Sequence, residues 1–213
     1  MKSRVTGRVR RCSSFLLCLV VVGGCGGSGP GRNAVPGTPG AFTVRTVSDP
    51  GFSIALPKTW RSLDSRTALT SGRLRRFAQA NPRLRAELRA LAGPNSPIKL
   101  LAVDPTGQQN FRANMNVIQT RVPKDLSFQQ LSKNEAAQIK LVSSVQHMRQ
   151  AAVELPAGRA LRLTYDVQSK GLVHQYFVKQ DDLLYVLTYT TSTATAPRYA
   201  KIFDLSAHTF QLR

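Results

Sequence analysis

The sequence predicts an α+β domain, an antiparallel sheet flanked by helices, and two observations lead to this fold class. Segments that alternate apolar and polar residues follow one another across short turns, and strands joined by short turns pair antiparallel. Between them lie segments whose apolar residues recur at spacings of three and four, the period of a helix that buries one face. This order of elements predicts a sheet with helices packed on it.

The first 24 residues are predicted to be a secretory signal peptide. Five positive charges and no acidic residue precede a short apolar run, residues 13–22, which ends in Gly23 and Gly24. A basic stretch, an apolar run and small residues at its end are typical of secretory signals. The run is too short to cross a bilayer, which needs about 20 apolar residues.

Cys25 directly follows these small residues. Residues 22–25, Val-Gly-Gly-Cys, resemble the lipobox of bacterial lipoproteins. The resemblance implies that the Cys25 thiol carries a diacylglyceryl group and that the signal is cut just before it. Two or three acyl chains, at about 0.8 kcal/mol per buried CH₂, would hold the protein stably on a membrane. The alternative is a buried, inert cysteine at the end of the apolar run.

The other two cysteines, Cys12 and Cys18, lie in the signal, so the mature chain would have no disulfide, thiolate metal site or cysteine nucleophile. Residues 25–41 are predicted to be the lipidated cysteine and a flexible tether, because residues 26–41 hold six Gly and three Pro. Such a coil would span about 22 Å. Residues 42–213 then form one domain with a sizeable core.

The chain carries a net charge of +19, and removal of the five signal charges leaves +14. An excess of this size favours anionic neighbours, which would be phospholipid head groups, cell-wall polymers or an acidic protein. Nucleic acid is not expected as a partner, because an exported lipoprotein rarely meets it.

Residues 42–47 and 52–56 are predicted strands of a hairpin, with Asp-Pro-Gly at 49–51 as its turn. Residues 67–92 then change to helical spacing, and Asn81-Pro82 divides them into two helices. This segment is rich in arginine. One interpretation is a surface that binds anionic lipid or wall polymer, and the other is a solvated helix face. The arginines proposed for binding are Arg73, Arg76, Arg83, Arg85 and Arg89.

Residues 98–104 and 113–122 are predicted strands, and residues 127–142 are a predicted helix with Ser127 as its cap. From there to residue 191 the pattern is that of consecutive strands. In one of them Leu161, Leu163, Tyr165 and Val167 alternate with Arg162, Thr164 and Asp166. A last helix follows Pro197. The aromatic residues of the late strands are predicted to lie in the sheet core rather than in a ligand cage. They are Tyr176, Phe177, Tyr185 and Tyr189.

Four segments together resemble PsbP-like α/β/α sandwich domains. They are GFSIALPKTW (51–60), ANMNVIQTRVP (113–123), SFQQL (127–131) and APRYAKIFDL (196–205). The resemblance covers about residues 45–210 and implies an α+β sandwich. Its members include a photosystem II extrinsic subunit, a Ran-binding nuclear transport factor and bacterial lipoproteins. The resemblance implies binding or assembly support, and it offers no catalytic residue to carry over.

The three histidines, His147, His174 and His208, are scattered along the chain. Two of them could lie near each other in the fold, but no metal site is expected without cysteines or clustered carboxylates. The sequence has no G-x-S-x-G elbow, no phosphate-cradling glycine loop and no spaced carboxylate pair. No catalytic residue and no cofactor is therefore predicted.

These observations predict a membrane-anchored extracytoplasmic lipoprotein that acts as a non-enzymatic binding or accessory module, with an unknown protein partner. Two alternatives stay open. An envelope hydrolase with an unrecognised site would show perturbed titratable groups gathered in one cleft. A carrier of an apolar ligand between sheet and helices would show a dry, elongated cavity.

Overall fold

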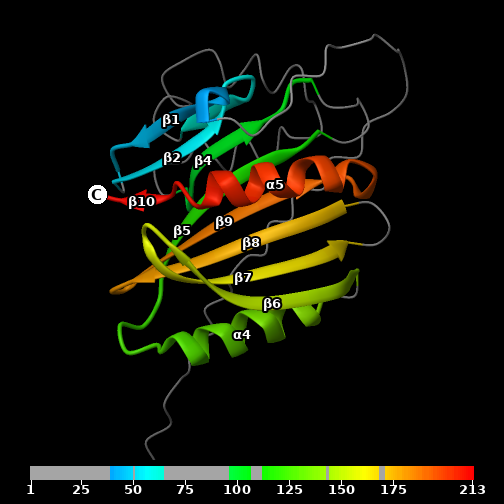
Figure 1. Cartoon of the computed structure of the whole chain (residues 1–213). Helices are drawn as coiled ribbons and strands as arrows, with labels where there is room; N and C mark the ends of the chain where they lie inside the picture. The colour runs from blue at the N-terminus through cyan, green and yellow to red at the C-terminus, as the bar shows by residue number, and fades with distance from the viewer. Residues whose placement is uncertain (1–38, 50, 65–95, 107–111, 143, 168–170) are drawn as a thin grey trace, which may run out of the picture.

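The computed structural model describes residues 39–49, 51–64, 96–106, 112–142, 144–167 and 171–213. Within these ranges the chain forms two antiparallel sheets and two α-helices (Figure 1). The α+β prediction is therefore confirmed. The predicted signal peptide, Cys25 and the arginine-rich segment lie outside the described residues. No helix in the described part is long and apolar enough to cross a membrane.

The small sheet has the strand order β1-β2-β10. The predicted hairpin is confirmed, because β1 (Phe42–Val47) and β2 (Phe52–Pro57) pair antiparallel from Phe42 opposite Pro57 to Val47 opposite Phe52. Its turn contains Gly51, whose φ of +63° favours glycine. A Cβ on Gly51 would also lie 3.1 Å from the carbonyl oxygen of Arg213. On its other edge β2 pairs with β10 (Gln211–Leu212), a strand that the sequence did not predict.

The large sheet has seven strands in the order β3-β4-β5-β9-β8-β7-β6, and neighbours are antiparallel. Strands β6 to β9 form a meander, and β6 lies at one edge. The bounds are β3 (Arg61–Asp64), β4 (Ile98–Val103), β5 (Asn114–Arg121), β6 (Val145–Leu155), β7 (Gly158–Val167), β8 (Gly171–Gln180) and β9 (Leu183–Thr191).

Each helix follows a local signal. Helix α4 (Phe128–Lys140) begins at Ser127, whose side chain accepts a hydrogen bond from the Gln130 amide while the Gln130 side chain accepts one from the Ser127 amide. This reciprocal capping box satisfies two helix-end donors. Helix α5 (Ala196–Ala207) instead has Pro197 in its first turn and no side-chain hydrogen bond at its N-cap residue.

The two helices cover opposite faces of the large sheet. On β8, Tyr176 belongs to the core with α5, whereas Phe177 belongs to the core with α4. Helix α5 packs on β2, β8 and β9, and α4 packs on β6 and β7. The four late aromatic side chains are buried as predicted, with at most 4% of each exposed. The first hairpin lies in a separate sheet, and β2 contacts the end of α5, where Ser206 Oγ donates to the Ala55 carbonyl at 2.7 Å.

Candidate functional site

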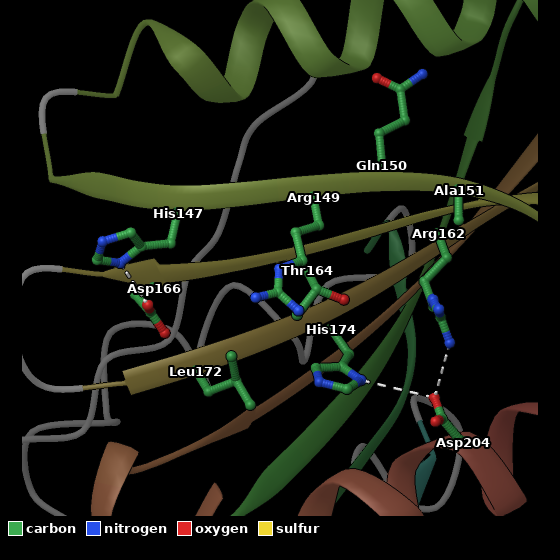
Figure 2. Close-up of a pocket in the computed structure, with 10 residues that line it drawn as sticks. All are labelled: His147, Arg149, Gln150, Ala151, Arg162, Thr164, Asp166, Leu172, His174 and Asp204. Carbon is green, nitrogen blue, oxygen red and sulfur yellow. Dashed lines mark hydrogen bonds and ion pairs between the residues drawn. The ribbon is translucent and has the colours of Figure 1, made fainter.

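A pocket of about 420 Å³ lies on the α5 side of the large sheet, at the strands β6, β7 and β8 (Figure 2). Helix α5 covers β8 and β9 on this side, and β6 lies beyond it at the sheet edge. The pocket is therefore open toward the edge strand and closed on one side by the helix. Its lining residues are His147, Arg149, Gln150, Ala151, Arg162, Thr164, Asp166, Leu172, His174 and Asp204.

Strand register brings most of these residues together. Arg149 on β6 lies opposite Thr164 on β7, and Thr164 lies opposite His174 on β8. The three therefore form one row across the strands, and directly opposed residues share a sheet face. The next row along the strands places Ala151 beside Arg162. Strands lie about 4.8 Å apart, so the row of Arg149, Thr164 and His174 sets three polar side chains next to one another at a fixed spacing.

A β-bulge shapes the outer end of the pocket. Between Gln146 and Arg149 the β6–β7 register shifts by one residue, and His147 in the bulge has a φ of +47°. Bulges re-aim side chains, and a left-handed non-glycine residue is uncommon. Here the bulge directs His147 toward the next strand, where its Nδ1 lies 3.0 Å from Asp166 Oδ2.

Asp204 on α5 is the polar centre of the inner wall. The Tyr176 hydroxyl donates a short hydrogen bond to Asp204 Oδ1, and Arg162 Nη1 lies 3.5 Å from the same oxygen. Partial burial raises the pKa of Asp204, but the His174 ring, the Tyr176 hydroxyl and the Arg162 guanidinium lower it more. The net shift is downward, so Asp204 is held as a carboxylate. Burial and the neighbouring carboxylate both raise the pKa of Tyr176, which keeps its donor proton.

His174 stands beside Asp204 at this wall. The residue is 6% exposed, and its ring packs edge-on against Phe203 at 5.6 Å between centroids. Its buried Nδ1 has no hydrogen-bond partner within the described part of the chain, and Asp204 Oδ1 lies 3.7 Å away, beyond hydrogen-bond reach. The contact is that of an ion pair, and Figure 2 shows Nδ1 turned toward the Asp204 carboxylate.

Two comparisons with solved structures place the fold. Cyanobacterial PsbP (CyanoP) from Synechocystis sp. PCC 6803 superposes with a TM-score of 0.53 at 13% identity, over 88% of this chain and 98% of that one. LpqN of Mycobacterium tuberculosis superposes with a TM-score of 0.52 at 14% identity, over 80% of this chain and 90% of that one. The domain has the PsbP-like fold. No protein-family model and no curated protein matches the sequence.

In this PsbP-like domain two of the three histidines, His147 and His174, line the same pocket. His208 lies at the end of α5, where its Nδ1 is 2.7 Å from the Asp204 carbonyl oxygen. Among the described residues no group of three histidines, cysteines or acids could hold a metal ion. The pocket thus pairs its histidines with separate carboxylates.

The residues of this pocket were not predicted to form a site. A signal was present, because Arg162, Thr164 and Asp166 occupy the polar face of β7. That alternation is typical of a strand with one solvated face, and nothing local separates a solvated face from a pocket wall. The missing information is the position of Asp204, which follows Tyr176 by 28 residues.

Proposed function

We propose that the protein is an extracytoplasmic lipoprotein, held on a membrane through Cys25, whose PsbP-like domain binds a ligand or partner without catalysing a reaction. The basic start, the short apolar run and Cys25 support the anchor. LpqN, which shares the fold, is described as involved in cell envelope biogenesis, and this supports a place in the envelope.

The pairing of polar groups in the pocket is the observation that carries the binding role. Asp204 accepts from Tyr176 and lies beside Arg162, while Asp166 is paired with His147. A nucleophilic mechanism needs a base within hydrogen-bond reach of a nucleophile, with a third group orienting the base. Perturbed pKa values do meet at this pocket, at Asp204 and Tyr176, as an envelope hydrolase would require. Asp166 also orients His147, but among the described residues no hydroxyl is hydrogen-bonded to that ring. The lack of a nucleophile beside the oriented ring favours the binding role.

A carrier of an apolar ligand receives less support from the packing. The space between α5 and the sheet is occupied by aromatic rings, and Phe203 lies 5.1 Å from Tyr189 and 6.5 Å from Trp60 between centroids. Such contacts are those of a filled core. The pocket lies outside this core and is lined by charged groups.

The arginine-rich segment adds a second proposed contact with the envelope. The arginines of this segment, proposed above as an anionic surface, would lean on anionic lipid or wall polymer beside the anchor. The mature charge of +14 supports this arrangement. Each arginine near an anionic surface contributes about 1 kcal/mol and loses it beyond a Debye length.

The anchor is tested with Cys25→Ala in cells fed a labelled fatty acid. The parent protein should take up the label and stay with the membrane, whereas Cys25→Ala should lose the label and remain uncleaved before residue 25. Cys18→Ala is the matched control, because Cys18 lies inside the apolar run, and it should be labelled like the parent. An unmodified Cys25 in membrane-derived parent protein, seen by mass spectrometry, would refute the anchor.

A further inference from the structure

We infer that the pocket at β6, β7, β8 and α5 is a binding site for a small organic oxyanion, a carboxylate or a phosphodiester, held by Arg149, Thr164 and His174. The inference rests on the proposed binding role of the domain and names the chemical class of the ligand. The carboxylate of a free metabolite and the phosphodiester of a lipid head group share this chemistry.

The first ground is the charge that is left over in the pocket. Arg162 lies beside Asp204, and His147 is paired with Asp166. Arg149 is exposed at the pocket and forms no ion pair with another residue in the described ranges. A guanidinium is always charged and offers a planar fork of donors that matches an oxyanion. Within the described residues, the pocket therefore holds one cation without an ion-pair partner.

The second ground is the His174 ring, which lines the pocket on a residue that is 94% buried. Its Nδ1 faces Asp204 Oδ1 at 3.7 Å, and Figure 2 shows the other ring nitrogen, Nε2, turned away from Asp204. An N–H at Nε2 would donate a hydrogen bond to an oxygen of a bound anion. Arg149, Thr164 and His174 stand in one row across three strands, so a guanidinium, a hydroxyl and an imidazole meet along one line.

The third ground is the size and lining of the pocket. Its volume of about 420 Å³ lies within the range of small-molecule sites and exceeds what a bare ion needs. Leu172 and Ala151 add apolar surface beside the charged groups. A ligand with an anionic group and an organic body of a few carbon atoms fits this combination.

The test compares three probes of nearly equal shape, benzoate, benzamide and benzamidinium, which differ in charge. The mature protein in a neutral detergent is titrated while amide NMR signals of Arg149, Thr164 and His174 are followed. Benzoate should bind at least tenfold more tightly than the neutral and cationic probes. Glycerophosphoglycerol, a head group without acyl chains, is compared with glycerol in the same way, and it separates the lipid source from the carboxylate source.

Three variants define the site. Arg149→Gln and His174→Phe should each weaken benzoate binding at least tenfold, and phenylalanine keeps the ring that packs on Phe203. Arg121→Gln is the matched control, because Arg121 is exposed and pairs with Asp182 on the β8–β9 turn. It should bind benzoate like the parent. If His174→Phe alters the fold, Thr164→Val replaces it in the same titration, and it should also weaken benzoate binding.

The outcomes separate this inference from the proposed function. Benzamide or benzamidinium binding as tightly as benzoate, with shifts at the same amides, would overturn the oxyanion class and leave the pocket as a ligand site. Unchanged benzoate affinity in Arg149→Gln and His174→Phe would likewise overturn it. No shift at these amides with any probe would overturn both the oxyanion inference and the binding role of the pocket. The labelling of Cys25 tests the anchor independently of all three results.

Discussion

Asp204 on α5 and Glu135 on α4 stand on opposite sides of the large sheet, and their pKa values move in opposite directions. Glu135 is 6% exposed, and burial raises its pKa to about 7. Asp204 is partly buried as well, but its neighbours bring its pKa below the usual value. The two carboxyl groups differ in their neighbours, because Asp204 has a tyrosine hydroxyl, an arginine and a histidine around one oxygen.

This contrast shows on which side of the sheet the fold places polar groups around a carboxyl. Burial alone disfavours a charged carboxyl, and donors placed around it reverse the effect. On the α4 side, burial is the cause of the shift at Glu135. On the α5 side, hydrogen bonds and cationic neighbours offset the burial of Asp204. We therefore expect mutations of the two acids to act on stability with opposite signs and in different pH ranges.

The largest expected effect comes from Glu135→Gln. A carboxyl whose pKa rises from 4.5 to about 7 on folding lowers stability as pH rises, because the unfolded chain ionises first. The loss begins near pH 4.5, is complete above pH 7 and amounts to about 3 kcal/mol, at about 1.4 kcal/mol per pKa unit. Glu135→Gln should therefore match the parent at pH 4 and exceed its stability by about 3 kcal/mol at pH 8, measured by urea unfolding.

Glu154→Gln serves as the control for that substitution, since Glu154 is exposed on β6. It should leave the pH dependence of stability as in the parent. If Glu135→Gln has the same stability as the parent at pH 8, ionising Glu135 in the folded state costs no free energy of unfolding. The contrast with Asp204 would then disappear.

Asp204→Asn should act in the other direction. The substitution removes the charge that Arg162 faces and weakens the bond from Tyr176, and a hydrogen bond to a charged group contributes about 2 kcal/mol. Because the folded pKa of Asp204 is depressed, its contribution is present above the unfolded pKa and is lost as pH falls through the folded value. We expect a loss of about 2 kcal/mol at pH 7 that shrinks at the acid end of the range.

Asp182→Asn provides the comparison for Asp204→Asn, because Asp182 pairs with Arg121 at the surface. Surface ion pairs contribute at most about 1 kcal/mol to the free energy of unfolding. Unfolding curves at several pH values compare the two variants. A loss from Asp204→Asn that is no larger than that from Asp182→Asn, at every pH, would contradict the network described for the pocket wall.

Local patterns explain how much of the fold is predictable. The first hairpin, the Ser127-capped helix and the strands up to residue 191 follow from alternation, turn residues and helical spacing. Strand β10 has two residues and β3 has four, which is too short for a period to register. The contact of β2 with the end of α5 joins Ala55 and Ser206 across 151 residues, and no local pattern predicts it.

The pocket was less predictable for the same reason. Its residues are ordinary in sequence, since Arg162 and Thr164 occupy the polar positions of an alternating strand. Their role depends on a register set by two neighbouring strands and on Asp204 arriving from the last helix. The bulge that turns His147 toward Asp166 is likewise a property of strand pairing. The residues around it include no glycine, so the sequence carries no local signal for a bulge.

The smallest expected effect concerns how the two helices begin. Helix α4 relies on the reciprocal bonds between Ser127 and Gln130, whereas the N-cap residue of α5 makes no side-chain cap bond. Ser127→Ala should lower the free energy of unfolding by about 1 kcal/mol, because it leaves a helix-end amide without its acceptor. Thr193→Ala, at an exposed position just before α5, should change the free energy of unfolding by less than about 0.5 kcal/mol. Thermal unfolding of both variants makes the comparison. Equal losses would mean that α4, like α5, is held by packing on the sheet and that its capping box adds nothing measurable.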